Sequence, residues 1–118
     1  MVRIVVLNDN RKNNPQLENE HGLSLYIEVD GYKILLDAGQ TDIFKKNAKK
    51  LGVNLDDLDT IVLSHGHYDH GNGLKHIDKK IPLICCPGCD CYRVSKRTGN
   101  YGGLNQKVEE LSEKFDLI

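Results

Sequence analysis

The sequence predicts an α/β fold, or α+β if the sheet is mostly antiparallel, in which helices flank a mixed sheet. Three observations lead to this prediction. Strand and helix patterns alternate from residue 23 onward, a two-residue turn separates two strands, and a short apolar run leads straight into a histidine-rich turn. At 118 residues the chain is expected to form a single domain, 1–118.

The charge balance argues against several kinds of partner. The 16 basic and 17 acidic side chains leave a formal net charge of −1. No nucleic-acid or membrane partner is therefore indicated, and a small-molecule substrate is expected. No apolar run approaches the ~20 residues needed to cross a bilayer. The apolar start of the chain ends at Asn8, too early for a signal peptide, so we expect a cytoplasmic protein.

The first elements are a strand and a long loop. Residues 2–7 are rich in valine and isoleucine, which favours a strand buried on both faces. Residues 8–22 carry polar side chains, Pro15 and Gly22 without an apolar period, which indicates a loop. Loops of this length are uncommon in compact domains and are often functional.

A β-hairpin follows the loop. Residues 23–29 alternate between apolar and polar side chains, the period-two pattern of a half-buried strand. Asp30 and Gly31 then give a two-residue turn signal before a second strand over 32–36. Asp37 ends that apolar strand, and an ionisable side chain in this position usually lies at a rim, where a ligand or a loop needs it.

An amphipathic helix is predicted over 42–51, with Thr41 as its N-cap and Gly52 ending it. Its lysines could be taken for an anion-binding patch, but a solvated helix face is the better interpretation. The apolar stripe consists of Ile43, Phe44, Ala48 and Leu51.

Shorter elements come next. A polar turn at 54–58 precedes an apolar strand at 60–64, and a short helix is predicted at 72–77. A strand at 81–84 leads into residues 85–104, which hold the cysteines and several glycines and are interpreted as loop.

The chain is predicted to end with a helix and the start of a strand. Asn105 can cap this helix, whose Val108, Leu111 and Phe115 share one face. Residues 116–118 resemble the opening of another strand.

The strongest chemical signal lies directly after the strand at 60–64. His65, His67, Asp69 and His70 fall within six residues. On an extended turn, residues two apart point the same way, so His65 and His67 can address one metal ion, and Gly66 leaves room for it. Asp69 and His70 can address a second ion, and two ions ~3.5–4 Å apart would lower the pKa of a water molecule. The alternative is a polar surface turn that happens to be rich in histidine.

These residues resemble a known family. The segment Thr60 to His70 matches the His-x-His-x-Asp-His signature of the metallo-β-lactamase superfamily, and Leu35 to Gly39 is similar to its first motif. The Val-Leu-Asn-Asp-Asn opening and the segment 95–99 most resemble the branch of dihydropterin ribofuranosyl-aminobenzene phosphate synthases. The resemblance covers about residues 1–84, and it implies half of an αββα sandwich.

The resemblance also implies roles for individual residues. His65 and His67 would ligate one metal, and Asp69 and His70 a second. Asp69 would also orient the attacking water or take its proton, as a catalytic residue. Asp37 would hydrogen-bond a ligand without binding metal itself. The implied reaction is hydroxide attack on an ester, amide or phosphoester, with one or two zinc ions as the expected cofactor and iron or manganese as alternatives.

The sequence departs from the family pattern in its second half. The family's remaining ligands lie there, and no histidine follows His76. We therefore expect a truncated chain whose site is completed by the missing C-terminal half, or a natural short protein that forms a homodimer. On its own it is expected to be weakly active or inactive. The other function left open is a non-catalytic metal-binding or interaction module that retains a half-site.

Four cysteines crowd into residues 85–91: Cys85, Cys86, Cys89 and Cys91. Cys86 and Cys89 have the spacing of half a zinc or iron–sulfur site, and they could hold a second metal or form a redox pair. The alternative is a set of reduced, partly buried thiols, as a reducing compartment favours. His21 and His76 stand alone in polar surroundings and are interpreted as surface residues.

Overall fold

Residues 1–11 and 14–118 are described by a computed structural model, so the predicted loop 8–22 is described except at positions 12–13. In the described residues, six strands form one mixed sheet in the order in which they occur along the chain. The first three pair antiparallel, and the remaining pairs are parallel. The predicted fold class is confirmed. The strands are β1 Val2–Asn8, β2 Ser24–Val29, β3 Tyr32–Leu36, β4 Thr60–Leu63, β5 Pro82–Cys85 and β6 Asp116–Leu117.

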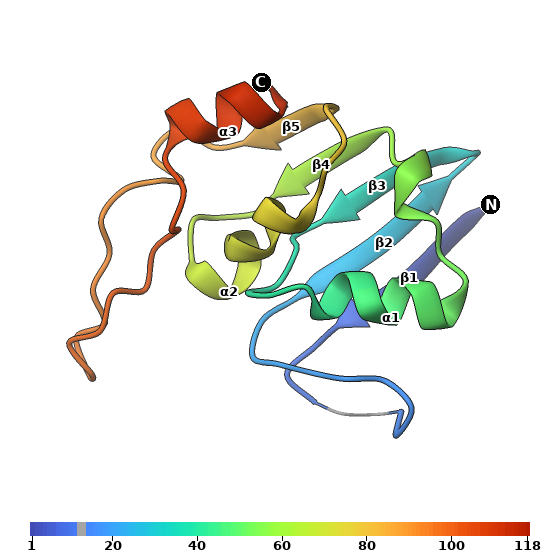
Figure 1. The fold of residues 1–118 in the computed structure, drawn as a ribbon, viewed down its shortest axis with the longest axis horizontal. Helices are drawn as coiled ribbons and strands as arrows, with labels where there is room; N and C mark the ends of the chain where they lie inside the picture. Colours follow the sequence, from blue (N-terminus) through green and yellow to red (C-terminus); the bar gives the residue numbers. More distant parts are fainter. Residues whose placement is uncertain (12–13) are drawn as a thin grey trace.

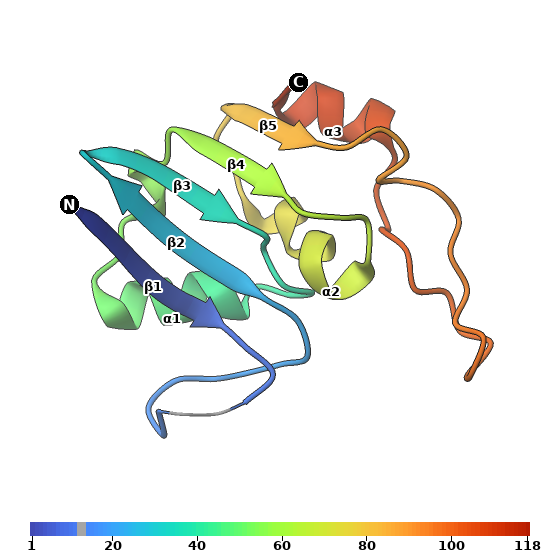
Figure 2. The ribbon, with the colours of Figure 1, turned by 180° about the vertical axis from the view of Figure 1, so that it is seen from behind.

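Helices connect the parallel strands and lie on one side of the sheet (Figures 1 and 2). A right-handed crossover through a helix is the usual way to join parallel neighbours. The helical elements are α1 Ile43–Leu51, α2 Tyr68–Gly71 and α3 Val108–Lys114, with 3₁₀ turns η1 Leu55–Asp57 and η2 Asn72–His76. The helix predicted at 72–77 is thus a 3₁₀ turn preceded by a short α-helix that starts inside the histidine motif.

The hairpin between β2 and β3 is confirmed. Asp30 and Gly31 have φ angles of 49° and 83°, the left-handed pair that two-residue hairpin turns require. The register pairs Val29 with Tyr32 and continues to Leu25 opposite Leu36. Asp37 follows directly after the last residue of β3, Leu36.

The predicted helix caps are wrong at both long helices, although the helices are present. Asp42 precedes α1, while the Thr41 hydroxyl donates to the Glu20 carboxylate. At α3, the Val108 N–H donates to Asp90 Oδ2, an anchor distant in sequence that local cap rules could not identify. Gly52 ends α1 with φ 73°, as predicted.

The two faces of the sheet differ sharply. The helix-covered face carries the buried residues Tyr26, Leu35, Ile61 and Leu83, which are register partners across β2 to β5. The opposite face is open in Figure 2. It is apolar nonetheless, formed by Val2, Ile4, Val6, Leu25, Ile27, Val29, Tyr32, Ile34, Leu36, Val62 and Ile84.

This arrangement corrects two expectations. β1 is not buried on both faces, because Ile4 is 59% exposed on the open side. The alternation in 23–29 is real, but the residues in contact with the core are Ser24 and Tyr26, whereas Leu25 and Ile27 face the open side. An apolar surface of this extent normally has a partner. In the described part of the chain, no helix is long and apolar enough to span a membrane.

Candidate metal centre

The histidine turn lies where β3 and β4 end. These strands are parallel neighbours, so the residues that follow them, Asp37 and Ser64, meet at one edge of the sheet. His65 to His67 form a non-helical turn, and Asp69 and His70 lie on α2. The His70 carbonyl accepts from the Ala38 N–H at 2.8 Å, which fixes α2 against the end of β3.

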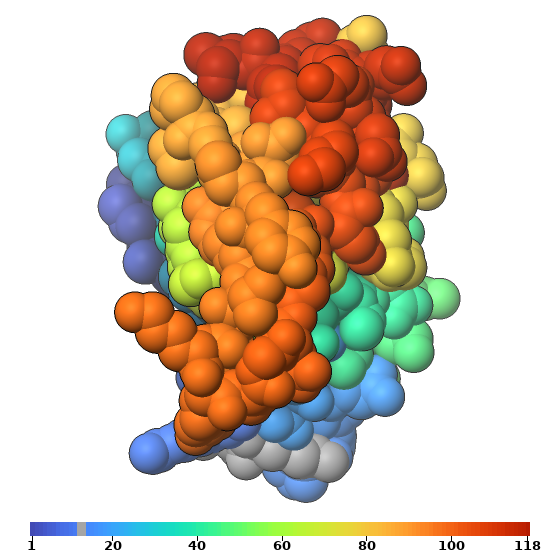
Figure 3. Space-filling model, turned by 90° about the vertical axis from the view of Figure 1, so that its left-hand side faces the viewer, coloured from blue at the N-terminus to red at the C-terminus, as the bar shows by residue number. Residues whose placement is uncertain are grey.

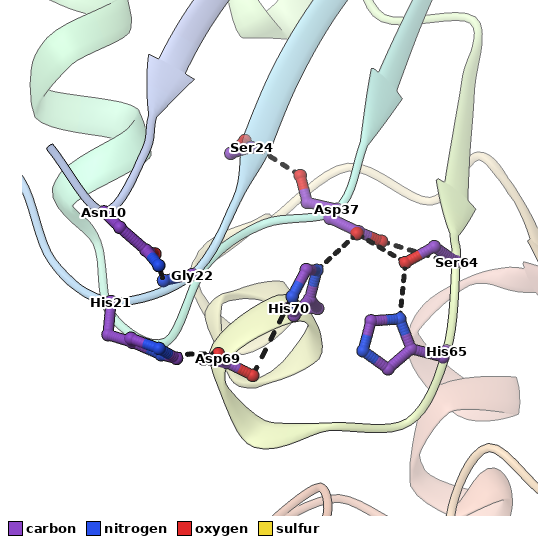
Figure 4. A network of polar contacts seen from close by, with 9 residues as sticks. All are labelled: Asn10, His21, Gly22, Ser24, Asp37, Ser64, His65, Asp69 and His70. Carbon is purple, nitrogen blue, oxygen red and sulfur yellow. Dashed lines mark hydrogen bonds and ion pairs between the residues drawn. The ribbon is translucent and has the colours of Figure 1, made fainter.

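Asp37 is the buried centre of this network (Figure 4). Its Oδ1 accepts from the Ser64 N–H at 2.7 Å, and its Oδ2 accepts from the Ser64 hydroxyl at 2.6 Å. The same Oδ2 lies 2.7 Å from His70 Nδ1. Asp37 itself has φ 58°, a backbone conformation that few residues other than glycine, asparagine and aspartate adopt. A side chain so enclosed orients its neighbours.

The hydrogen bonds fix which nitrogen of each imidazole is free. A carboxylate only accepts, so His70 Nδ1 donates to Asp37, and in the neutral imidazole Nε2 keeps a lone pair. Ser64 donates its single hydroxyl proton to Asp37, so its oxygen accepts from His65 Nδ1, 2.8 Å away. Both histidines therefore leave Nε2 available, and a metal-binding histidine is usually held by a second group in this way.

Three imidazoles crowd together at this point. The ring centroid of His65 lies 4.2 Å from that of His70 and 4.6 Å from that of His67. Burial, followed by the neighbouring histidines, lowers the pKa of His65. The neutral form, which is the form that binds metal, is therefore favoured.

The side chains that could hold a metal include three with donor atoms in close proximity. One donor atom each from Asp37, His65 and His70 lies within 4.8 Å of the others. Because the Asp37 carboxylate is already engaged by three donors, we interpret it as the anchor of His70. Within the described residues, His67 and Asp69 fall outside this close group. Asp69 Oδ1 nevertheless lies 3.9 Å from His70 Nε2.

Gly66 has a different role from the one expected. A side chain here would clash with the Cys89 carbonyl, so the missing side chain makes room for another stretch of backbone and not for an ion. Arg93 holds that stretch in place, donating to the carbonyl oxygens of Gly88, Cys89 and Cys91. Figure 3 shows the segment 85–104, in orange, lying across the body beside the yellow-green end of β4.

A cavity of about 330 Å³ opens beside the turn, between α2 and this segment. Its size suits a small molecule. Its lining includes His21, His67, Asp69, Arg93, Val94 and Ser95.

Two residues of the site were missed from the sequence. Ser64 was seen only as the end of a strand, although its hydroxyl links Asp37 to His65. His21 is on the surface as expected, but it is not alone, because its Nδ1 lies 2.7 Å from Asp69 Oδ2. No local pattern signals the contact of Ser64 with Asp37 or that of His21 with Asp69, since the two residues of each pair are 27 or more positions apart.

The four cysteines are free thiols. The sulfur atoms that approach one another are those of Cys85 and Cys89, 3.5 Å apart, while Cys86 is exposed. Burial, together with the hydrogen bond to Cys85, raises the pKa of Cys89 to about 12. The pairing of Cys86 with Cys89 stays a prediction.

Comparisons with known proteins agree with this fold. The family model described as Metallo-beta-lactamase superfamily matches residues 18–84. An uncharacterized protein of Methanocaldococcus jannaschii is 36% identical over 121 residues, covering 99% of this chain and 46% of that protein. A 7,8-dihydropterin-6-methyl-4-(beta-D-ribofuranosyl)-aminobenzene-5'-phosphate synthase of the same organism is 36% identical, covering 82% of this chain and 37% of its own length.

Solved structures show the same relationship. The crystal structure of a metal-dependent hydrolase of the beta-lactamase superfamily matches 100% of this chain and 41% of its own, with a TM-score of 0.82 and 30% identity. The chain thus spans less than half the length of these relatives.

Proposed function

Because this chain belongs to the metallo-β-lactamase superfamily, we propose that it supplies half of the active site of a metal-dependent hydrolase. The observation that carries the proposal is the pair of hydrogen bonds that His70 Nδ1 donates to Asp37 and His65 Nδ1 donates to Ser64. Together they leave two Nε2 atoms as ligand atoms on imidazole rings that lie side by side. A surface turn that merely contained histidines would have no reason to bury a carboxylate beneath them.

We assign His65, His67, Asp69 and His70 as the metal ligands. Imidazole nitrogen and carboxylate oxygen form a donor set that fits zinc first, with iron or manganese as alternatives. Asp37 holds His70 in place and does not bind the ion. The motif provides no more than half of a two-ion site, so the isolated chain would hold one ion, and more weakly than a complete site.

Bound metal supplies a Lewis acid and lowers the pKa of a water molecule. The residues of the chain provide the remaining functions. Asp69 orients the attacking water or accepts its proton. The cavity beside His67 and Asp69 receives a small-molecule ester, amide or phosphoester. The name of the dihydropterin relative contains a 5'-phosphate, which supports a phosphoester as the first substrate class to test.

The open apolar face of the sheet supports the other half of the proposal. We propose that a second sheet covers it, supplied by a C-terminal half. The isolated chain would use a second copy of itself to cover the same surface. The clustered free thiols support a reducing compartment such as the cytoplasm.

The alternative is a non-catalytic metal-binding module. It is favoured by the single close group of three donor atoms within the described residues. Such a module would bind zinc but would not gain activity when the site is completed.

The test measures metal binding and turnover separately. Purified chain is loaded with zinc and assayed on bis(p-nitrophenyl) phosphate, alone and linked to the C-terminal half of a longer relative. We expect zinc binding that is lost in His65→Ala and His70→Ala but kept in His76→Ala, with turnover only in the linked protein. Zinc binding without turnover in the linked protein would favour the module, and no zinc binding would contradict both candidates.

A further inference from the structure

The loop before β2 reaches the metal centre through one histidine. His21 Nδ1 lies 2.7 Å from Asp69 Oδ2, and Figure 4 shows the two side chains facing each other. The other oxygen of Asp69, Oδ1, is the one on the side of His70 Nε2. The two oxygens of this carboxylate therefore lie next to different histidines, Oδ2 next to His21 and Oδ1 on the side of His70.

The backbone of the loop is built against Asp69. Gly22 has φ 131°, and a side chain there would clash with the Asp69 carbonyl. The Leu23 N–H donates to that same carbonyl, while the Gly22 N–H donates to Asn10 Oδ1 at 2.7 Å. These contacts fix the position of His21 relative to Asp69, even though the His21 side chain is 65% exposed.

The His21 carbonyl is held as well. It accepts from Gln40 Nε2 at 2.9 Å, and the Gly39 N–H donates to the Leu23 carbonyl at 3.0 Å. The loop is thus connected both to α2 and to the segment that follows Asp37. These contacts position the part of the loop around His21, as a functional residue on a loop requires.

The contact repeats an arrangement seen twice in the same centre. His70 is held at Nδ1 by Asp37, and His65 is held at Nδ1 by Ser64, so each keeps its other nitrogen for a ligand. Asp69 is held at Oδ2 and keeps Oδ1. Partners of this kind fix the orientation of a ligand and typically change metal affinity by about 10–100-fold when removed.

From this geometry we propose that His21 is a positioning residue of the metal centre, which holds Asp69 so that Oδ1 stays on the side of His70 Nε2, where an ion would bind. The proposal rests on the proposed function, because it takes Asp69 as a ligand. It assigns a role to the loop 8–22, and it requires His21 to donate one hydrogen bond and nothing more. Asparagine can place an amide N–H where Nδ1 lies, whereas alanine cannot.

The experiment compares four proteins: the unaltered chain, His21→Ala, His21→Asn and, as a matched control, His76→Ala. Zn²⁺ affinity is measured by competition with a chelator, and the visible absorption of bound Co²⁺ reports the arrangement of the ligands. We expect His21→Ala to bind Zn²⁺ about tenfold or more weakly, with an altered Co²⁺ spectrum. His21→Asn should remain within about threefold of the unaltered chain, and His76→Ala should match it.

The thermal unfolding of all four metal-free proteins is expected to be nearly equal, because His21 and His76 contribute little to the core. If the unaltered chain binds Zn²⁺ and His21→Ala binds it with the same affinity, the role proposed for His21 is overturned, while the proposed function stands. Equal loss in His21→Ala and His21→Asn would also overturn that role, since a hydrogen bond could not then explain the effect. No metal binding by the unaltered chain would overturn the proposed function together with this inference.

Discussion

Replacing Asp37 by asparagine tests the hydrogen-bond network that orients the histidines. The substitution keeps the size of the side chain and tolerates the φ of 58°. The Ser64 N–H needs an acceptor, so the amide oxygen must take the place of Oδ1 and the amide nitrogen that of Oδ2. A donor then faces His70 Nδ1 and the Ser64 hydroxyl, where an acceptor was before.

The consequences can be followed atom by atom. His70 must accept at Nδ1 and so carries its proton on Nε2, the atom proposed to bind metal. The Ser64 hydroxyl, no longer needed by Asp37, turns its proton to His65 Nδ1 and moves the His65 proton to Nε2 as well. Both ligand atoms are then blocked, and we expect Zn²⁺ affinity to fall by about 10–100-fold.

The same change affects stability. Hydrogen bonds to a charged group contribute about 1.5–3 kcal/mol each. Two of the three bonds to Asp37 end on Oδ2, and the amide recovers part of them in reversed form. We therefore expect the free energy of unfolding of the metal-free chain to fall by about 2–3 kcal/mol.

Urea denaturation and chelator competition measure the two effects. Asp30→Asn is the matched control, since Asp30 also has a positive φ but is exposed, and among the described residues its side chain bonds only to the N-terminal amine. It should stay within about 0.5 kcal/mol of the original chain. Unchanged Zn²⁺ affinity in Asp37→Asn would refute the assignment of the ligand nitrogens.

Three further predictions concern the rest of the fold. The isolated chain should self-associate through the open face, where Ile4 is exposed. Ile4→Lys should therefore give a monomer, whereas the control Lys46→Glu on α1 should not. Analytical ultracentrifugation that finds the unaltered chain monomeric at micromolar concentration would contradict this prediction. Gly66→Ala should lower the melting temperature, because the new side chain would clash with the Cys89 carbonyl. Gly102→Ala should leave the melting temperature unchanged, because the space around Gly102 is open. Equal effects of the two substitutions would show that close packing at Gly66 does not stabilise the fold. Iodoacetamide at pH 8 should label Cys86 and Cys91 but spare Cys89, as mass spectrometry can show. Rapid labelling of Cys89 would show that it is not buried. Burial raises the pKa of Cys89 above its ordinary value of 9, so the folded chain keeps a proton that the unfolded chain loses. The free energy of unfolding should therefore fall as the pH rises above 9.

The sequence was a good guide where local chemistry decides structure. The Asp30–Gly31 turn, the end of α1 at Gly52 and the apolar face of α3 follow from residue preferences that act within a few positions. The position of Asp37 at a strand end also followed, because β3 was recognisable as an apolar run. Its place next to the histidine turn was implied by the family resemblance.

What could not be predicted depends on contacts between distant segments. Thr41 bonds Glu20 instead of capping its helix, because the loop 8–22 returns to lie beside it. The apolar side of β2 faces away from the helices, since the pattern shows which residues share a face but not what covers that face. His21 lies on the surface as predicted, but its contact with Asp69 could not be predicted, because only the folded loop brings the two residues together.

The central claim is that metal binds at the histidine turn and not at the cysteine cluster. X-ray absorption at the zinc edge of the loaded chain tests it most directly, since zinc–nitrogen and zinc–sulfur distances differ, at about 2.0–2.1 Å and about 2.3 Å respectively. We expect a shell of nitrogen and oxygen with at least two imidazole ligands and no sulfur. A shell dominated by sulfur would place the metal on Cys85 to Cys91 and contradict the account.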